Sequence, residues 1–151
     1  DQRPEFAIDK NKPFTIELGR GSGWDGLDTF SIDETGAVSV HETTNGRRVS
    51  FSLTNKQLDS LLESVSANQL MRLCREYHDD DVSDGTQWIL SIHQNNRWKT
   101  VYFNNYFPKQ INDFAEELDE IISLESRSSL RWEQAENRSK LWDRLNKENA
   151  K

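Results

Sequence analysis

Hydrophobic and polar residues alternate in four short segments of the first third of the chain. In the first of them, Phe14, Ile16 and Leu18 share one side, and this period of two is typical of a half-buried β-strand. Turn sequences such as Asn45-Gly46 separate the later segments and are typical of β-hairpins. We therefore expect four consecutive antiparallel strands. The segments are residues 14–18, 29–33, 37–42 and 49–53.

Helical spacing follows these strands. Thr54 and Gln57 match the capping box T-x-x-Q, in which two side chains bond to free backbone N–H groups at a helix start. Ser66 and Gln69 repeat the motif. We therefore expect a bend near Ser66 and a second short helix, with Cys74 buried on its apolar side. The apolar positions of this region are Leu58, Leu61, Leu62, Val65, Leu70 and Leu73.

The pattern then returns to strands and ends in another helix. Residues 87–94 and 97–104 are predicted strands joined at Asn95-Asn96, and Pro108 fits the first turn of a helix. An apolar stripe from Ile111 to Ile122 has helical spacing. The order ββββ-α-ββ-α predicts an α+β fold, with an antiparallel sheet of about six strands and the helices packed on one face.

Composition divides the chain into three parts. Residues 1–13 form a polar N-terminal arm, residues 14–125 form the α+β domain, and residues 126–151 are predicted to be a C-terminal amphipathic helix. This last segment has seven basic and four acidic residues and contains Trp132 and Trp142. The two tryptophans indicate that it docks, either on its own domain or on a partner.

Charge excludes several classes of partner. The chain has a formal net charge of −7, which argues against nucleic acid, because nucleic-acid binding needs a basic surface. It equally disfavours an anionic membrane surface. No run of residues is long and apolar enough to span a membrane. The single cysteine, Cys74, permits no internal disulfide and does not reveal the compartment.

Aspartates gather in the segment Asp79 to Asp84, ahead of Gly85. A calcium loop of the EF-hand kind fails here because Val82 and Ser91 would occupy ligand positions. A looser calcium site built from Asp79, Asp81 and Asp84 stays open as an alternative. Because aspartate and glycine also favour turns, we interpret the segment first as a loop between a helix and a strand.

No other residue set supports catalysis or a cofactor. The three histidines, at positions 41, 78 and 93, lack zinc-site spacing. Cys74 and His78 could share a helical face as a nucleophile and base, which leaves an unusual hydrolase as the weakest hypothesis. The glycine-rich stretch 19–26 lacks the G-K-[ST] of a phosphate loop. We therefore expect a protein that is not an enzyme and holds no cofactor.

Several turn motifs together resemble a bacterial family. They are Gly23-Trp24-Asp25-Gly26 after the first strand, Asp33-Glu34-Thr35-Gly36, the Leu53 to Leu58 helix start, and Asp84-Gly85 before a strand. Over about residues 14–123 the chain is similar to a widespread family of small uncharacterised α+β domains, and distantly similar to the protealysin inhibitor emfourin. The resemblance implies an exported or periplasmic protein, in some members lipid-anchored, and supplies no catalytic residues.

Two functions follow as hypotheses. The first is a non-catalytic domain that binds another protein, as an inhibitor or immunity-type factor. Its contacts would come from Trp24, Trp132 and Trp142, because tryptophan is enriched at binding hot spots. The second is an exported domain that binds calcium or a small ligand through the Asp79–Asp84 loop.

Overall fold

The computed structural model describes residues 6–22, 26–43, 46–79, 81, 85–125 and 131–134. Its elements are β1 (Phe14–Ser22), β2 (Gly26–Asp33), β3 (Ala37–Glu42), β4 (Arg47–Ser52), α1 (Asn55–Ala67), the 3₁₀ turn η1 (Leu70–Arg72), β5 (Glu76–His78), β6 (Thr86–Gln94), β7 (Arg97–Asn104), α2 (Lys109–Glu125) and β8 (Arg131–Gln134). The expected α+β class is confirmed.

One sheet joins all the strands in the order β5-β7-β6-β1-β2-β3-β4-β8. Every pairing is antiparallel except that of β5 with β7, which is parallel. The prediction of about six strands was wrong by two. β5 was missed because three residues are too few for a period to be visible, and β8 because its segment was assigned to a helix.

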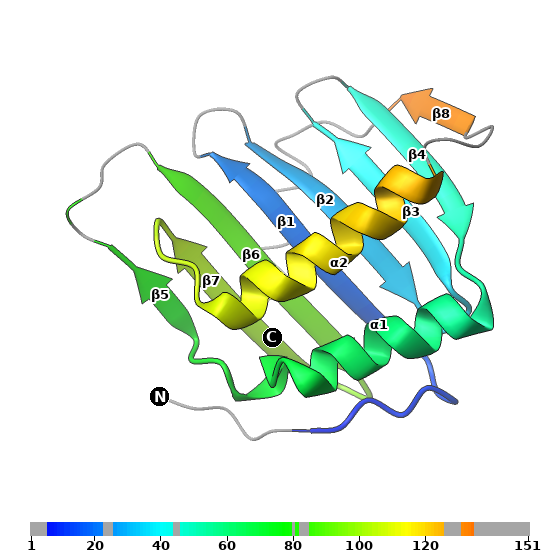
Figure 1. The fold of residues 1–151 in the computed structure, drawn as a ribbon, viewed down its shortest axis with the longest axis horizontal. Coiled ribbons are helices and arrows are strands. Elements are labelled where there is room, and N and C mark those ends of the chain that lie inside the picture. The colour runs from blue at the N-terminus through cyan, green and yellow to red at the C-terminus, as the bar shows by residue number, and fades with distance from the viewer. Residues whose placement is uncertain are drawn as a thin grey trace.

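Both helices lie on the same face of the sheet (Figure 1), and that face forms the main core. Phe14, Ile16 and Leu18 of β1 point to the helices and are buried, the latter two completely. They meet Phe114 and Leu118 of α2, which are also fully buried. The alternation of apolar residues therefore predicted correctly which side of the first strand is internal.

The glycine-rich stretch after Leu18 is part of a hairpin and does not interrupt the strand. β1 continues through Gly19 and Gly21 to Ser22, which pairs with Gly26 of β2. A Cβ atom added at Gly21 would lie 1.9 Å from the backbone oxygen of Gly26. The two backbones approach each other too closely for a side chain, so glycine here permits strand pairing.

The first capping box is present as predicted, and the second is not. The Thr54 hydroxyl accepts from the N–H of Gln57 at 3.1 Å, and the Gln57 side chain accepts from the N–H of Thr54 at 2.8 Å. Ser66 lies inside α1, and Gln69 has a left-handed backbone with φ 53°. The chain therefore leaves the helix at Ala67 and makes only one 3₁₀ turn, where a second helix was expected.

Cys74 was placed wrongly by the sequence. It lies in the link between η1 and β5 and is exposed, because no helix continues to give it an apolar side. His78 belongs to the strand β5. The two residues therefore do not share a helical face, and the geometry that would have allowed a nucleophile–base pair is absent from this part of the described chain.

The two ends of the chain differ from a simple arm and tail. In the described part of the arm, Phe6 is buried in the main core, and the Gln94 side chain bonds to the backbone of Asp9 at 2.8 and 2.7 Å. At the other end, Arg131–Gln134 pair with β4 as a strand. The predicted helix over 126–151 therefore does not include these four residues; the remainder of that segment lies outside the described residues.

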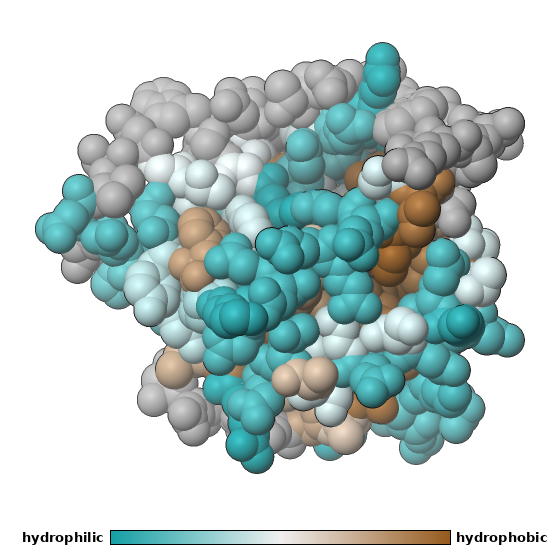
Figure 2. Space-filling view, in the orientation of Figure 1, coloured by the Kyte–Doolittle hydropathy of each residue, from teal (hydrophilic) through white to brown (hydrophobic). Residues whose placement is uncertain are grey.

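Hydrophilic side chains cover most of the described surface on the helix side (Figure 2). Only two large hydrophobic residues among the described ones are exposed, Tyr106 at 53% and Leu124 at 56%. Within the described ranges, neither helix combines the length and the apolar character needed to cross a bilayer.

Candidate functional site

Four connections join strand ends at the same end of the sheet, which we call the loop end. They are residues 23–25, 43–46, 79–85 and 105–108. The register places them there: Ser22, the last residue of β1, pairs with both Gly26 and Thr86, and Asn104 pairs with Gln87. Figure 1 shows the corresponding ends of β1, β2 and β6 along the same edge of the sheet.

The loop end is acidic by sequence. Its four connections contain five aspartates and no lysine or arginine. Asp25 comes from one loop and Asp79 to Asp84 from another, more than fifty positions later. Strand pairing between β1 and β6 places Ser22, which precedes the first loop, opposite Thr86, which follows the second. The segments that contain Trp24 and the aspartates are therefore attached to adjacent strands at the same end, although Trp24 itself lies outside the described residues.

Asp79 uses its carboxylate to turn the backbone. Its Oδ1 accepts a hydrogen bond from the N–H of Asp81 at 3.0 Å, and its own N–H donates to the carbonyl of Asn104 at 3.0 Å. This is the arrangement of an Asx turn. Among the residues that the structure describes, no group of three or more histidine, cysteine, aspartate or glutamate side chains could hold a metal ion. Asp84, the third residue of the alternative calcium set, lies outside them.

Gly85, at the end of the aspartate loop, is in close contact with the connection that precedes α2. A Cβ atom at Gly85 would lie 1.2 Å from Oδ1 of Asn105. Asn105 has a left-handed backbone with φ 62°, and its N–H donates to the carbonyl of Thr86 at 2.9 Å. The side chain of Asn105 therefore lies directly against the backbone of Gly85, and the two connections are in contact here.

An exposed aromatic side chain, Tyr106, lies at the loop end. Its ring stacks on Tyr77 with centroids 6.0 Å apart, and Tyr77 stacks on the buried Phe103 at 5.6 Å. The hydroxyl of Tyr77 accepts a hydrogen bond from the N–H of Cys74 at 2.9 Å. Burial raises the pKa of Tyr77, although the Cys74 N–H partly lowers it. The stack therefore places one face of the Tyr106 ring against Tyr77, which in turn packs on the core residue Phe103.

A second aromatic contact connects the loop end to α2. Trp88 packs against Phe107 with centroids 4.7 Å apart, and the guanidinium of Arg20 lies 5.5 Å from the Trp88 ring. Arg20 also donates two hydrogen bonds to Asp119 of α2, at 3.0 and 2.6 Å. A bidentate pair of this kind fixes orientation as well as charge. The loop end is thus anchored to the helix layer.

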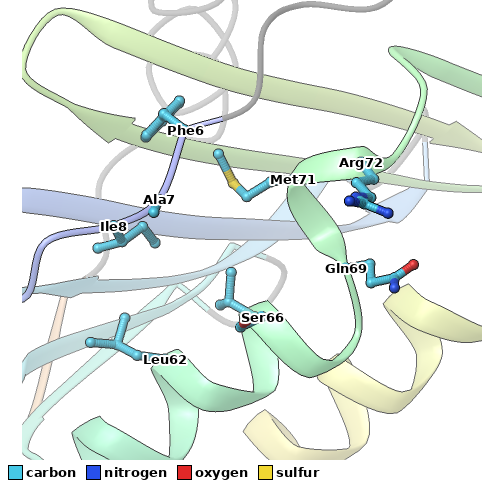
Figure 3. A pocket seen from close by; sticks show the side chains of 9 residues that line it. Phe6, Ala7, Ile8, Leu62, Ser66, Gln69, Met71 and Arg72 are labelled. Carbon is cyan, nitrogen blue, oxygen red and sulfur yellow. The ribbon is translucent and has the colours of Figure 1, made fainter.

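A separate pocket lies between the N-terminal arm and the end of α1 (Figure 3). It has a volume of about 490 Å³. Phe6, Ile8, Leu62 and Met71 supply apolar lining, and Gln69 and Arg72 lie toward η1. Among the described residues, no carboxylate, histidine or cysteine lines it, so the pocket offers no group for acid–base chemistry.

Of the three tryptophans predicted to bind a partner, only Trp132 belongs to the part of the chain that the structure describes, so their role stays a prediction. Trp132 is part of β8, at the edge of the sheet beside β4, and Trp24 lies outside the described residues. Trp142 lies outside the described residues. Tyr106 was overlooked, although its position between a strand and Pro108, in the sequence Asn-Tyr-Phe-Pro, identified it as a loop residue.

Comparison with protein-family models and with curated proteins finds no match for this chain.

Proposed function

We propose that this protein is a non-catalytic domain that binds another protein through the loop end. The observation that supports it most strongly is the combination of five aspartates with an exposed tyrosine on a stacked base. Exposed aromatic residues held in place lose little conformational freedom on binding, and tyrosine is enriched at hot spots.

The charge of the loop end specifies the kind of partner. An acidic surface attracts a basic one and speeds their encounter, with strong dependence on salt. The partner would offer lysine or arginine side chains around a cleft that accepts the Tyr106 ring. The resemblance to the bacterial family of small α+β domains, and the distant one to emfourin, supports an inhibitor or immunity-type role for an exported protein. The geometry of Cys74 and His78 gives no support to a hydrolase.

The test is capture of the partner from an extract of the source organism by the immobilised full chain. We expect Tyr106→Ala to weaken the captured complex by about 10- to 100-fold, the range for a hot-spot residue. The pair Asp79→Asn and Asp81→Asn should weaken it less and reduce its salt dependence. Leu124→Ala is the matched control, because Leu124 is equally exposed but lies near the end of α2.

Equal capture by the wild-type chain and the Tyr106 and aspartate variants would contradict the proposal. Loss of capture in Leu124→Ala alone would move the binding surface to α2.

A further inference from the structure

The face of the sheet opposite the helices, which we call the far face, is polar along a continuous row. Glu17 of β1 pairs with Ser91 of β6 on one side and with Ser31 of β2 on the other. Because paired residues share a face, the row extends across six strands. In sheet order it consists of Thr100, Ser91, Glu17, Ser31, Ser39 and Ser50.

Much of this face is nevertheless buried. Glu17 is 5% exposed, Ser91 6% and Thr100 2%. Beside the row, Leu27 and Ile89 are 2% and 3% exposed and form a small apolar cluster with Tyr102. A sheet face in contact with water would expose a glutamate in its middle. Since α1 and α2 both lie on the opposite face (Figure 1), another part of the chain must cover this one.

Chain length identifies the segment that can do so. The other stretches outside the described residues are at most five residues long, whereas residues 135–151 form a run of seventeen. Gln134 of β8 lies opposite Arg47 at the sheet edge, so this run starts beside the face. From β8 to β6 is five strand steps, about 24 Å. Seventeen residues span about 26 Å even as a helix.

The chemistry of the two surfaces is complementary. Residues 135–151 contain five basic and three acidic residues, in a chain whose net charge is −7. They also contain Leu141, Trp142 and Leu145, apolar side chains of the kind that would cover Leu27 and Ile89. We propose that residues 135–151 fold back over the far face, with these apolar residues over the Leu27 cluster and a basic side chain near Glu17.

This fold-back concerns a different surface from the loop end and does not rest on the proposed partner binding. It makes Trp142 part of the domain itself. The sequence left open whether the tryptophan-bearing segment docks on its own domain or on a partner. Under this proposal, residues 135–151 dock on their own domain.

Thiol labelling of the full chain tests the fold-back. In a Cys74→Ser background, a cysteine at position 91 (Ser91→Cys) reports on the buried part of the far face. We expect slow labelling, and at least tenfold faster labelling when Trp142→Ser and Leu145→Ser are added. Ser50→Cys is the matched control, because Ser50 lies in the same row but is exposed, so its labelling should be fast in both chains.

A helix-side control reports on unfolding. Val101 is fully buried on the helix side of the sheet. A cysteine at this position (Val101→Cys) should therefore stay protected from labelling in the chain that carries Trp142→Ser and Leu145→Ser. If it does not, Arg144→Glu with Lys147→Glu is used in place of the tryptophan and leucine substitutions, and the same acceleration at position 91 is expected. Fast labelling at position 91 in the unsubstituted tail overturns the proposal. So does slow labelling with every tail variant, and so does protection that depends on protein concentration, which would assign the cover to a second copy.

Discussion

At the loop end, the side chain of Asp79 forms a hydrogen bond that stabilises a turn of the backbone. Its carboxylate accepts a hydrogen bond from the N–H of Asp81, and its own N–H donates to the carbonyl of Asn104 in the neighbouring strand β7. Aspartate favours turns because its short side chain can bond to the backbone two residues later. One oxygen of the carboxylate is therefore already engaged without any ion.

This engagement leads to a prediction about calcium. Adding calcium to the full chain should produce no binding heat in titration calorimetry and no change in melting temperature. The reason is that calcium prefers six to eight oxygen ligands, whereas Asp79 contributes to a turn. A saturable heat that disappears in Asp79→Asn would instead establish the calcium site of the alternative hypothesis.

Tyr77 gives the molecule a dependence on alkaline pH. Burial in the stack raises its pKa above the ordinary value of 10.0. A group whose pKa is raised in the folded state contributes stability that is complete below the unfolded pKa and is lost as pH rises through the folded one. We therefore expect the free energy of unfolding to fall as pH rises from about 10 upward.

Urea unfolding at about pH 9 and about pH 11 measures this fall. In Tyr77→Phe the phenol is absent, so the difference between the two pH values should be smaller than in the wild-type chain. A difference of the same size in both chains would assign the alkaline loss to other groups.

At the scale of elements, the capping-box motif occurs twice in the sequence, once at each end of α1, but it caps a helix only at the first. Thr54 and Gln57 cap the helix, whereas Ser66 lies in its last turn and Gln69 has already left it. Thr54→Ala should therefore lower the free energy of unfolding by about 1 kcal/mol. Ser66→Ala, the matched control, should change it by less than about 0.5 kcal/mol. Chemical denaturation of both variants checks this; equal losses would indicate that the second box is formed.

The elements that the sequence predicted are those whose hydrophobic pattern continues over several residues. β1 alternates over Phe14, Ile16 and Leu18, and α2 has apolar residues at helical spacing from Ile111 to Ile122, about three turns. Both kinds of pattern follow from which side of the element is buried. β5 has only three residues and gains its hydrogen bonds from β7, a distant strand, so no local signal could reveal it.

At the scale of the whole molecule, the candidate site depends on pairings between distant segments. The aspartate loop and the Trp24 loop were each visible in the sequence, but that their flanking residues Thr86 and Ser22 pair follows from the register of β1 against β6. Tyr106 gains its role from stacking on Tyr77, nearly thirty positions earlier. Local patterns therefore identified the types of residue, whereas the surface they form required the strand order.

The central place of β1 also has a consequence for how the chain folds. β1 pairs locally with β2, but its other neighbour is β6, which joins Glu17 to Ser91. Closing a loop of that length costs about 4 kcal/mol of chain entropy before any contact repays it. The β1–β4 meander and the β6–β7 hairpin can each form early, and we expect their docking along β1 to be the late, rate-limiting event.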